Sequence, residues 1–483
     1  MKRGIAAQAL VLSISRIVNQ GLQILSPVIL VRLLTVTQFG QYREFLLYVT
    51  LLVPICTLSI TNSLIYFVPR TPARTWSLVR LSVILVACST ALVVAGMIVL
   101  QALSGWRFIA QYFWQLLLYL TLLTNIDFWE SLWLAQRRTS AVFAYTSSRL
   151  LVRLLVVIVA AAISHDVGVI LVSLIVMEAL RVAIAALAWR RLARGQVVPL
   201  PPHEWREQLH WALPVAVATV IATVNDQMGG VFIVKILGAA ALAQYAIGGY
   251  AQLVISTVRN SVSDVLLPAM AGEQQVERML AMWKDATVVF TLLLLPCIAL
   301  MIRFADPLIS FVFSAKYHSA VPVFQAYALT LVFACFDFPV LLRAINRTRV
   351  FIVVGIVTMI VNLATLAFMT LWFGLVGAVA SLLLTRLIAF LWYYRLVVQF
   401  VGCAPRDLIR WKDAGKITLA TLLATLVVLP SFWTARPGIL GAIAGSCCFV
   451  ACYAIAVHYC HIPETRQIVA AIRSRLAKRM PQS

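Results

Sequence analysis

The sequence has 483 residues, of which 62% are hydrophobic and 12% are charged, and its formal net charge is +22. A water-soluble chain carries about 25% charged residues, so this composition excludes a soluble enzyme, a fibrous protein and a disordered chain. Nine cysteines are too sparse for a disulfide-stapled secreted domain. The composition is that of an integral membrane protein, in which the positions of the charges matter more than their sum.

Runs of about 20 mainly apolar residues are long enough to cross a bilayer as helices. The sequence contains fourteen such runs, separated by charged residues, Pro or Gly. They lie at residues 8–31, 42–67, 78–101, 113–135, 141–163, 167–189, 210–235, 241–268, 285–304, 321–342, 350–372, 375–397, 414–433 and 438–459. This pattern predicts an all-α polytopic membrane protein with about 14 transmembrane helices and no separate soluble domain.

Lys and Arg are distributed unequally between the two sets of span ends. The set that includes both chain termini holds 26 of the 39 cations, the opposite set holds seven, and six fall inside the spans. Because cytoplasmic loops are enriched in Lys and Arg, this asymmetry predicts that both termini are cytoplasmic. The high net charge therefore reflects the orientation of the spans in the membrane and does not indicate a nucleic-acid partner.

Two pairs of similar sequence segments indicate an internal repeat. Residues 32–42 and 235–245 both run from a basic residue to Gln-Tyr, and Asp127-Phe128 and Asp337-Phe338 are both followed by an Arg-Thr pair. Six spans per repeat give both halves the same topology, as in transporters with two parallel lobes and a cleft between them. The predicted division is an N-terminal six-helix lobe at 1–198, a cytoplasmic interfacial linker at 199–209, a C-terminal six-helix lobe at 210–400, and two extra helices with a basic cytoplasmic tail at 401–483.

Cations inside the predicted spans are candidates for binding an anionic substrate. An ionised side chain near the bilayer centre costs about 2.5–3.5 kcal/mol on insertion scales, and the planar guanidinium group binds phosphate through two hydrogen bonds. Internal charge pairing is the alternative, as between Glu178 and Arg181 or between Arg259 and Asp264, and the sequence leaves both roles open. The residues predicted to line the interlobe cavity are Arg16, Asn19, Gln23, Arg153, Arg259 and Arg386.

Carboxylates inside the spans are candidates for binding a coupling proton or sodium ion. Asp226 is the foremost of them because Asn225 and Gln227 flank it and could share a cation. A structural hydrogen bond or ion pair is the alternative role for each. The other candidates are Asp127, Asp264 and Asp337. The cysteines near the end of the chain lack the spacing of zinc ligands, and the sequence predicts neither a metal site nor catalytic residues.

Several motifs resemble those of a known transporter family. Residues Arg32-Leu-Leu-Thr-Val-Thr-Gln-Phe-Gly-Gln-Tyr42 are similar to the family motif R-L-L-G-x-x-x-F-G-x-Y, although Thr35 replaces its glycine. Further matches are Phe313-Ser-Ala-Lys-Tyr317 and Phe373-Gly-Leu-Val-Gly-Ala-Val379. By their order and spacing the chain looks like a member of the polysaccharide-transport branch of the multidrug, oligosaccharidyl-lipid and polysaccharide exporter superfamily.

The resemblance implies a flippase of the bacterial cytoplasmic (inner) membrane rather than an enzyme. It implies transport of an undecaprenyl-pyrophosphate-linked oligosaccharide by alternating access, for capsule, exopolysaccharide or lipopolysaccharide assembly. It also implies proton or sodium coupling without another cofactor, and partners among polysaccharide polymerase and chain-length proteins. The basic tail at 473–479 would suit anionic membrane lipids.

Three alternatives remain open on the sequence alone. Arg16, Arg43 and Arg259 also resemble the arginines of lipid II flippases, which would make Arg43 a substrate-binding residue. A drug or sodium antiporter of the same superfamily would need an acidic cavity for its cationic substrate. A polytopic glycan polymerase or ligase would need an extracellular loop that carries catalytic acids or bases, whereas the outer loops predicted here are short.

Overall fold

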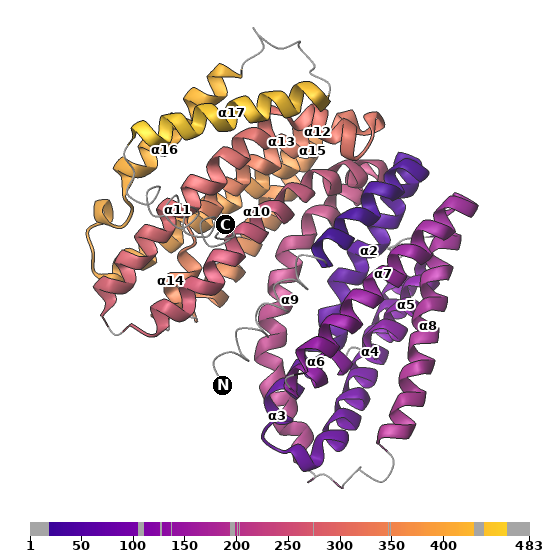
Figure 1. The fold of residues 1–483 in the computed structure, drawn as a ribbon. Helices are drawn as coiled ribbons and strands as arrows, with labels where there is room; N and C mark the ends of the chain where they lie inside the picture. The colour runs from indigo at the N-terminus through magenta and orange to yellow at the C-terminus, as the bar shows by residue number, and fades with distance from the viewer. Residues whose placement is uncertain are drawn as a thin grey trace, which may run out of the picture. The chain divides into compact units, whose positions relative to one another are not determined.

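The computed structural model describes residues 19–104, 111–125, 128–136, 138–193, 199, 201, 203–273, 275–345, 347, 349–428 and 439–460. Every regular element in these residues is an α-helix or a short 3-10 helix, as the composition predicts (Figure 1). Within them, eight helices are long and apolar enough to cross a membrane, or nine if the bent pair α2 and α3 is one span. The protein is therefore an all-α, multi-pass membrane protein.

The chain divides into two compact units, Met1–Ala243 and Gln244–Ser483. Helix α9, the seventh predicted span, packs on α2 and α3 and so belongs to the first unit. It begins at Glu204, which makes the second half of the linker predicted at 199–209 helical. The compact units thus divide after Ala243, whereas the sequence places the lobe boundary at the linker.

The first unit is a bundle of helices that run alternately up and down. Helical residues 19–33 precede α2. A capping box starts α2, in which the Thr35 side chain accepts a hydrogen bond from the Gln38 backbone N–H, and the Gln38 side chain accepts one from Thr35 N–H. The labelled elements are α2 Val36–Thr57, α3 Ile60–Phe67, η1 Pro72–Arg74, α4 Thr75–Ser104, α5 Phe113–Thr124, α6 Phe128–Ala135, α7 Thr139–Ser164, α8 Val167–Leu192 and α9 Glu204–Leu237.

One end of the first unit gathers arginines. The end of α3, the start of α7, the last turn of α8 and the first turn of α9 lie there, because the helices alternate in direction (Figure 1). We call this the basic end; its arginines are Arg70, Arg74, Arg138, Arg190, Arg191 and Arg206. The structure thus brings together at one end cations that are up to 136 positions apart in the sequence.

The second unit contains the remaining helices. Its last two, α16 and α17, pack on each other and on α11, so the two helices without a repeat partner are part of this unit's core. The elements are α10 Ala239–Ala271, which begins in the first unit, α11 Val276–Arg303, α12 Ala305–Val312, η2 Ala315–Ala320, α13 Val321–Thr330, η3 Leu331–Cys335, α14 Phe338–Ala344, α15 Val350–Val401, η4 Pro405–Asp407, α16 Trp411–Val427 and α17 Ile439–Tyr459.

Helix α15 is a hairpin of two legs, because it breaks at Gly374, whose φ of 60° lies in the region that favours glycine. The hydroxyls of Thr365 and Ser381 are 2.7 Å apart, a contact that a straight helix could not make between residues 16 positions apart. A Cβ atom at Gly377 would lie 2.0 Å from the Met369 carbonyl oxygen. The legs match the two spans predicted at 350–372 and 375–397.

Each unit contains a broken span at the place where the Asp-Phe pair is repeated in the sequence. In the first unit α5 ends at Thr124 and α6 begins at Phe128. In the second unit α13 and η3 end at Cys335, and α14 begins at Phe338. The repeat is thus visible in the fold as an interrupted helix at corresponding places, with an Asp immediately before the Phe in both sequences.

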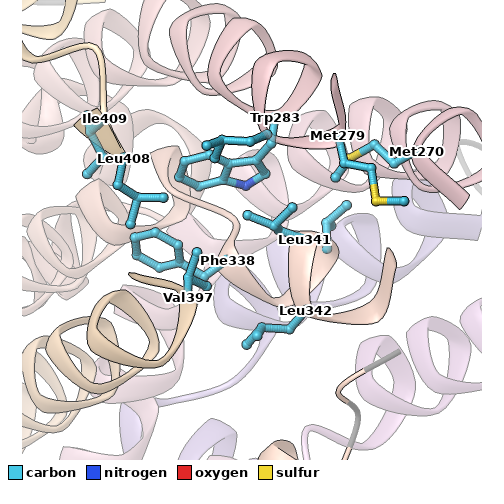
Figure 2. Close-up of a cluster of buried hydrophobic side chains, with 11 residues drawn as sticks. Met270, Met279, Trp283, Phe338, Leu341, Leu342, Val397, Leu408 and Ile409 are labelled. Carbon is cyan, nitrogen blue, oxygen red and sulfur yellow. The ribbon is translucent and has the colours of Figure 1, made fainter. Parts of the chain in front are cut away.

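The break before α14 is held by a buried hydrophobic cluster. Trp283 of α11 is fully buried and stacks on Phe338, with ring centroids 5.2 Å apart. Figure 2 shows this indole above Phe338 and Leu341, with Val397 of the second α15 leg below. The Trp283 indole N–H also donates a hydrogen bond to the Asp337 carbonyl oxygen at 3.0 Å, so packing and hydrogen bonding together fix the backbone of Asp337.

Candidate functional site

The second unit encloses a cavity of about 140 Å³ between α10, the segment from η3 to α14, and the second leg of α15. Three of the residues singled out in the sequence line it: Arg259, Asp337 and Arg386. Aromatic rings form much of the remaining wall, and these belong to Phe333, Phe336, Phe338, Phe390 and Tyr393. The cavity therefore has a net positive charge, and much of its wall is apolar.

Among the described residues, no group accepts a hydrogen bond from the buried Nε of Arg259. Its Nη2 donates to the Asn260 side chain at 3.4 Å. A buried donor without an acceptor is costly, and a charged donor costs more. Arg259 therefore has free capacity to bind an anion inside the cavity.

Asp337 lies in the break of the tenth span, where the chain leaves one helical segment and enters the next. Its Oδ2 accepts a hydrogen bond from the Ser263 hydroxyl at 2.7 Å, and its backbone oxygen accepts the bond from Trp283. Helix α10 thus supplies both Arg259 and the residue that orients Asp337. The cavity places one carboxylate beside two guanidinium groups.

The sequence analysis missed two polar residues of this cavity, Gln252 and Ser256. Together with Arg259 they are spaced at i, i+4 and i+7, which puts all three on one face of α10. Extending the polar stripe from Arg259 towards the start of the helix would have identified them. Tyr393, seven positions after Arg386 on α15, follows the same spacing and could have been found in the same way.

The first unit holds a different cluster of buried charge. Glu178 of α8 is 1% exposed, and its Oε2 lies 2.7 Å from Arg181 Nε. The N–H of that Nε does not point at the oxygen, so the contact is an ion pair without hydrogen-bond geometry. Arg181 also donates to the Tyr145 hydroxyl and to the Leu123 carbonyl oxygen, both at 3.4 Å. Internal pairing, one of the two roles open for span cations, is thus realised for Arg181.

Arg153 of α7 borders this cluster. Its guanidinium lies within electrostatic range of Tyr42, Tyr119 and Glu178.

Four other predicted site residues lie in the described part of the chain. Asn19 accepts a hydrogen bond from the Ser147 hydroxyl at 3.1 Å, which ties the first helix to α7. Gln23 is exposed and Arg43 is half-buried. Asp226 is exposed on α9. Arg16, Asp127 and the side chain of Asp264 lie outside the described residues.

A sequence profile of the family described as polysaccharide biosynthesis protein matches residues 5–274. A comparison with curated protein sequences finds no match. Among solved structures, the lipid II flippase MurJ in an inward closed conformation is similar, with 14% identity and a TM-score of 0.68 over 95% of this chain and 99% of that one.

Two further structures share the architecture. An inward-facing multidrug resistance transporter of the MATE family has 14% identity and a TM-score of 0.58, over 79% of this chain and 95% of that one. A transporter of the MOP superfamily from Pyrococcus furiosus has 14% identity and a TM-score of 0.53, over 82% and 96%. At this identity the likeness shows the fold alone, which these polytopic transporters share.

Proposed function

Because the chain belongs to the polysaccharide biosynthesis protein family, we propose that it is a flippase for an oligosaccharide linked to undecaprenyl pyrophosphate. It would carry this lipid from the cytoplasmic to the outer leaflet of a bacterial inner membrane, by alternating access. The oligosaccharide would be used for capsule, exopolysaccharide or lipopolysaccharide assembly. The transporter fold supports transport rather than catalysis, and polymerase and chain-length proteins are the partners that would receive the product.

The observation that carries this proposal is the cavity with Arg259 and Arg386. A pyrophosphate needs charged donors that keep their charge away from water, and arginine is the side chain that does so. The unpartnered Nε of Arg259 supplies a donor for such an anion. The aromatic wall provides flat apolar faces for the attached sugar, while the polyprenyl chain would stay in the lipid.

The remaining candidates keep their proposed roles in the same pathway. Arg16, Asn19, Gln23, Arg43 and Arg153 would contact the head group from the N-terminal lobe during its passage. We propose proton or sodium coupling at Asp226, with Asp127, Asp264 and Asp337 as the further candidates. In vesicles with an imposed ion gradient, Asp226→Asn is expected to make transport independent of the gradient, and unchanged gradient dependence would contradict this role.

A lipid II flippase is the second candidate function. The observation that favours it is the MurJ likeness, which extends over almost the full length of both chains. Both substrates carry a polyprenyl pyrophosphate. The cavity lined by Arg259 and Arg386, which we call the arginine cavity, therefore suits either. They differ in the group that the pyrophosphate carries.

Reconstituted vesicles test the proposal directly. The purified chain is expected to move a pyrophosphate-linked oligosaccharide across the bilayer, and lipid II at a lower rate. Arg259→Ala should reduce this transport tenfold or more, because a hydrogen bond to a charged group contributes about 1.5–3 kcal/mol, and Arg259→Lys should restore part of it. Arg278→Ala removes an exposed arginine of the same unit, whose partner Glu273 lies 3.7 Å away, and serves as the control. Equal transport by Arg259→Ala and Arg278→Ala would exclude Arg259 from the substrate site.

A further inference from the structure

A second hollow lies at the basic end of the first unit, between the end of α3 and the first two turns of α9. Its volume is about 480 Å³, and it is lined by Tyr66, Phe67, Arg206, Glu207, His210 and Trp211. It is separate from the arginine cavity, which is formed by residues of the second unit, and the proposed transport cycle does not use it.

Aromatic rings form the floor of this hollow, and arginines stand beside it. The Tyr66 and Trp211 ring centroids are 5.5 Å apart. The Arg70 guanidinium lies 3.4 Å from the Tyr66 ring centroid, and one of its nitrogens donates to the Tyr66 carbonyl oxygen. The Arg206 guanidinium lies 5.2 Å from the Trp205 ring centroid. Cation–π contacts hold both arginines without cancelling their charge.

Two carboxylates of α9 lie nearby, and one of them, Glu207, lines the hollow itself. Glu204 pairs with Arg74 at 3.5 Å, and Glu207 lies 3.6 Å from His203. In the described part of the chain, the contacts of Arg70 and Arg206 are with rings and a backbone oxygen. Arg70 and Arg206 together outweigh the one carboxylate of Glu207, so the net charge at the hollow is positive and suits an anion.

The face of α9 indicates which kind of anion fits. Arg206, His210, Leu213 and Val217 follow one another at i, i+4, i+7 and i+11, so they lie on one helix face. Leu213 and Val217 are 40% and 53% exposed. This face changes from cationic to apolar along its length, as a surface does that meets a lipid head group and then its acyl chains. Tyrosine and tryptophan are also the residues enriched at the membrane–water boundary.

We propose that this hollow binds one anionic phospholipid. Its phosphodiester contacts Arg206 within the hollow and Arg70 at the rim, while an acyl chain lies along Leu213 and Val217. The apolar half of the face selects a lipid over a soluble phosphate. This site is independent of the proposed transport function, because a chain that moves no glycan would still bind the lipid.

Native mass spectrometry of the full chain tests this site. The protein, taken from phosphatidylcholine nanodiscs with increasing phosphatidylglycerol, is expected to retain one phosphatidylglycerol more tightly than further copies. A basic residue near an anionic surface contributes roughly a fivefold gain in affinity, so Arg70→Gln with Arg206→Gln should weaken this binding at least tenfold. Arg70→Lys with Arg206→Lys should retain most of it.

The matched control removes the same charge from the same end. Arg190 and Arg191 are exposed in the last turn of α8, and replacing both by Gln should leave the tight copy in place. An equal loss in both double variants would show diffuse charge attraction and overturn the site. Displacement of the lipid by its deacylated head group at equal concentration would overturn the assignment to a lipid. If the double variant does not fold, Arg206→Gln alone, at an exposed side chain, replaces it with an expected loss of about fivefold.

Discussion

The two units of the chain differ in the surroundings of a partly buried arginine. In the first unit Arg181 lies 2.7 Å from a carboxylate that is 1% exposed. In the second unit Arg259 borders a cavity together with Arg386, and within the described residues it forms no ion pair. The same residue type thus pairs with a buried carboxylate in one unit, whereas in the other it lines a cavity that we propose binds a ligand.

The largest effect is expected from breaking the pair in the first unit. Glu178→Gln leaves Arg181 buried without its counter-charge, and removing one partner of a buried pair costs roughly 3–5 kcal/mol. Thermal unfolding in detergent should show a large fall in Tm. Glu207→Gln, at an exposed carboxylate, is the control and should leave Tm nearly unchanged. A Tm for Glu178→Gln equal to that of the control would show that the pair does not stabilise the fold.

Replacing both partners sharpens the comparison. Apolar substitution of a whole buried ion pair is often neutral or stabilising, so Glu178→Leu with Arg181→Met should recover most of the Tm lost in Glu178→Gln. Transport by the double variant should stay close to that of the parent chain, because we place this pair in the scaffold. A stable double variant without transport would instead move Arg181 into the substrate pathway.

The sequence predicts the helices better than it predicts the roles of their charges. Apolar runs and short connections identify the spans, and Gly374 divides the two legs of α15 where expected. The short helices α12 and η2 have no counterpart in the predicted spans, because the 16 residues from Ala305 to Ala320 are too few for a span and contain no long apolar run.

Roles depend on distances between helices, which one sequence does not supply. The Glu178–Arg181 pair could be anticipated because its partners are one helical turn apart. The cavity lined by Arg259 and Arg386 depends instead on how α10 packs near the second leg of α15, since these two arginines are 127 positions apart in the sequence. Likewise the hydrogen bond from Ser263 to Asp337 spans 74 positions, and no local pattern in the sequence indicates it.

Loss of that bond tests how the second unit holds its carboxylate. Ser263→Ala removes the hydroxyl that donates to Asp337 Oδ2 at 2.7 Å, and a hydrogen bond to a charged group contributes about 1.5–3 kcal/mol. The effect on stability should fall below that of Glu178→Gln, because Asp337 also lies against the cavity and keeps its backbone bond from Trp283. Ser256→Ala, on the same face of α10, is the control. A Tm loss in Ser263→Ala as large as in Glu178→Gln would mean that both units bury charge with equal cost.

The smallest effect on stability is expected where the effect on transport is largest. Arg259→Met keeps the length of the side chain and removes a buried donor without a partner, so Tm should stay the same or rise slightly. Arg181→Met should lower it, because Glu178 then stays buried without the arginine that lies 2.7 Å from it. Compared by their Tm values, the two variants distinguish Arg181, which we expect to stabilise the fold, from Arg259, whose charge we expect to lower stability. If Arg259→Met loses as much stability as Arg181→Met, then Arg259 is a structural residue, and the two units do not differ in the way proposed.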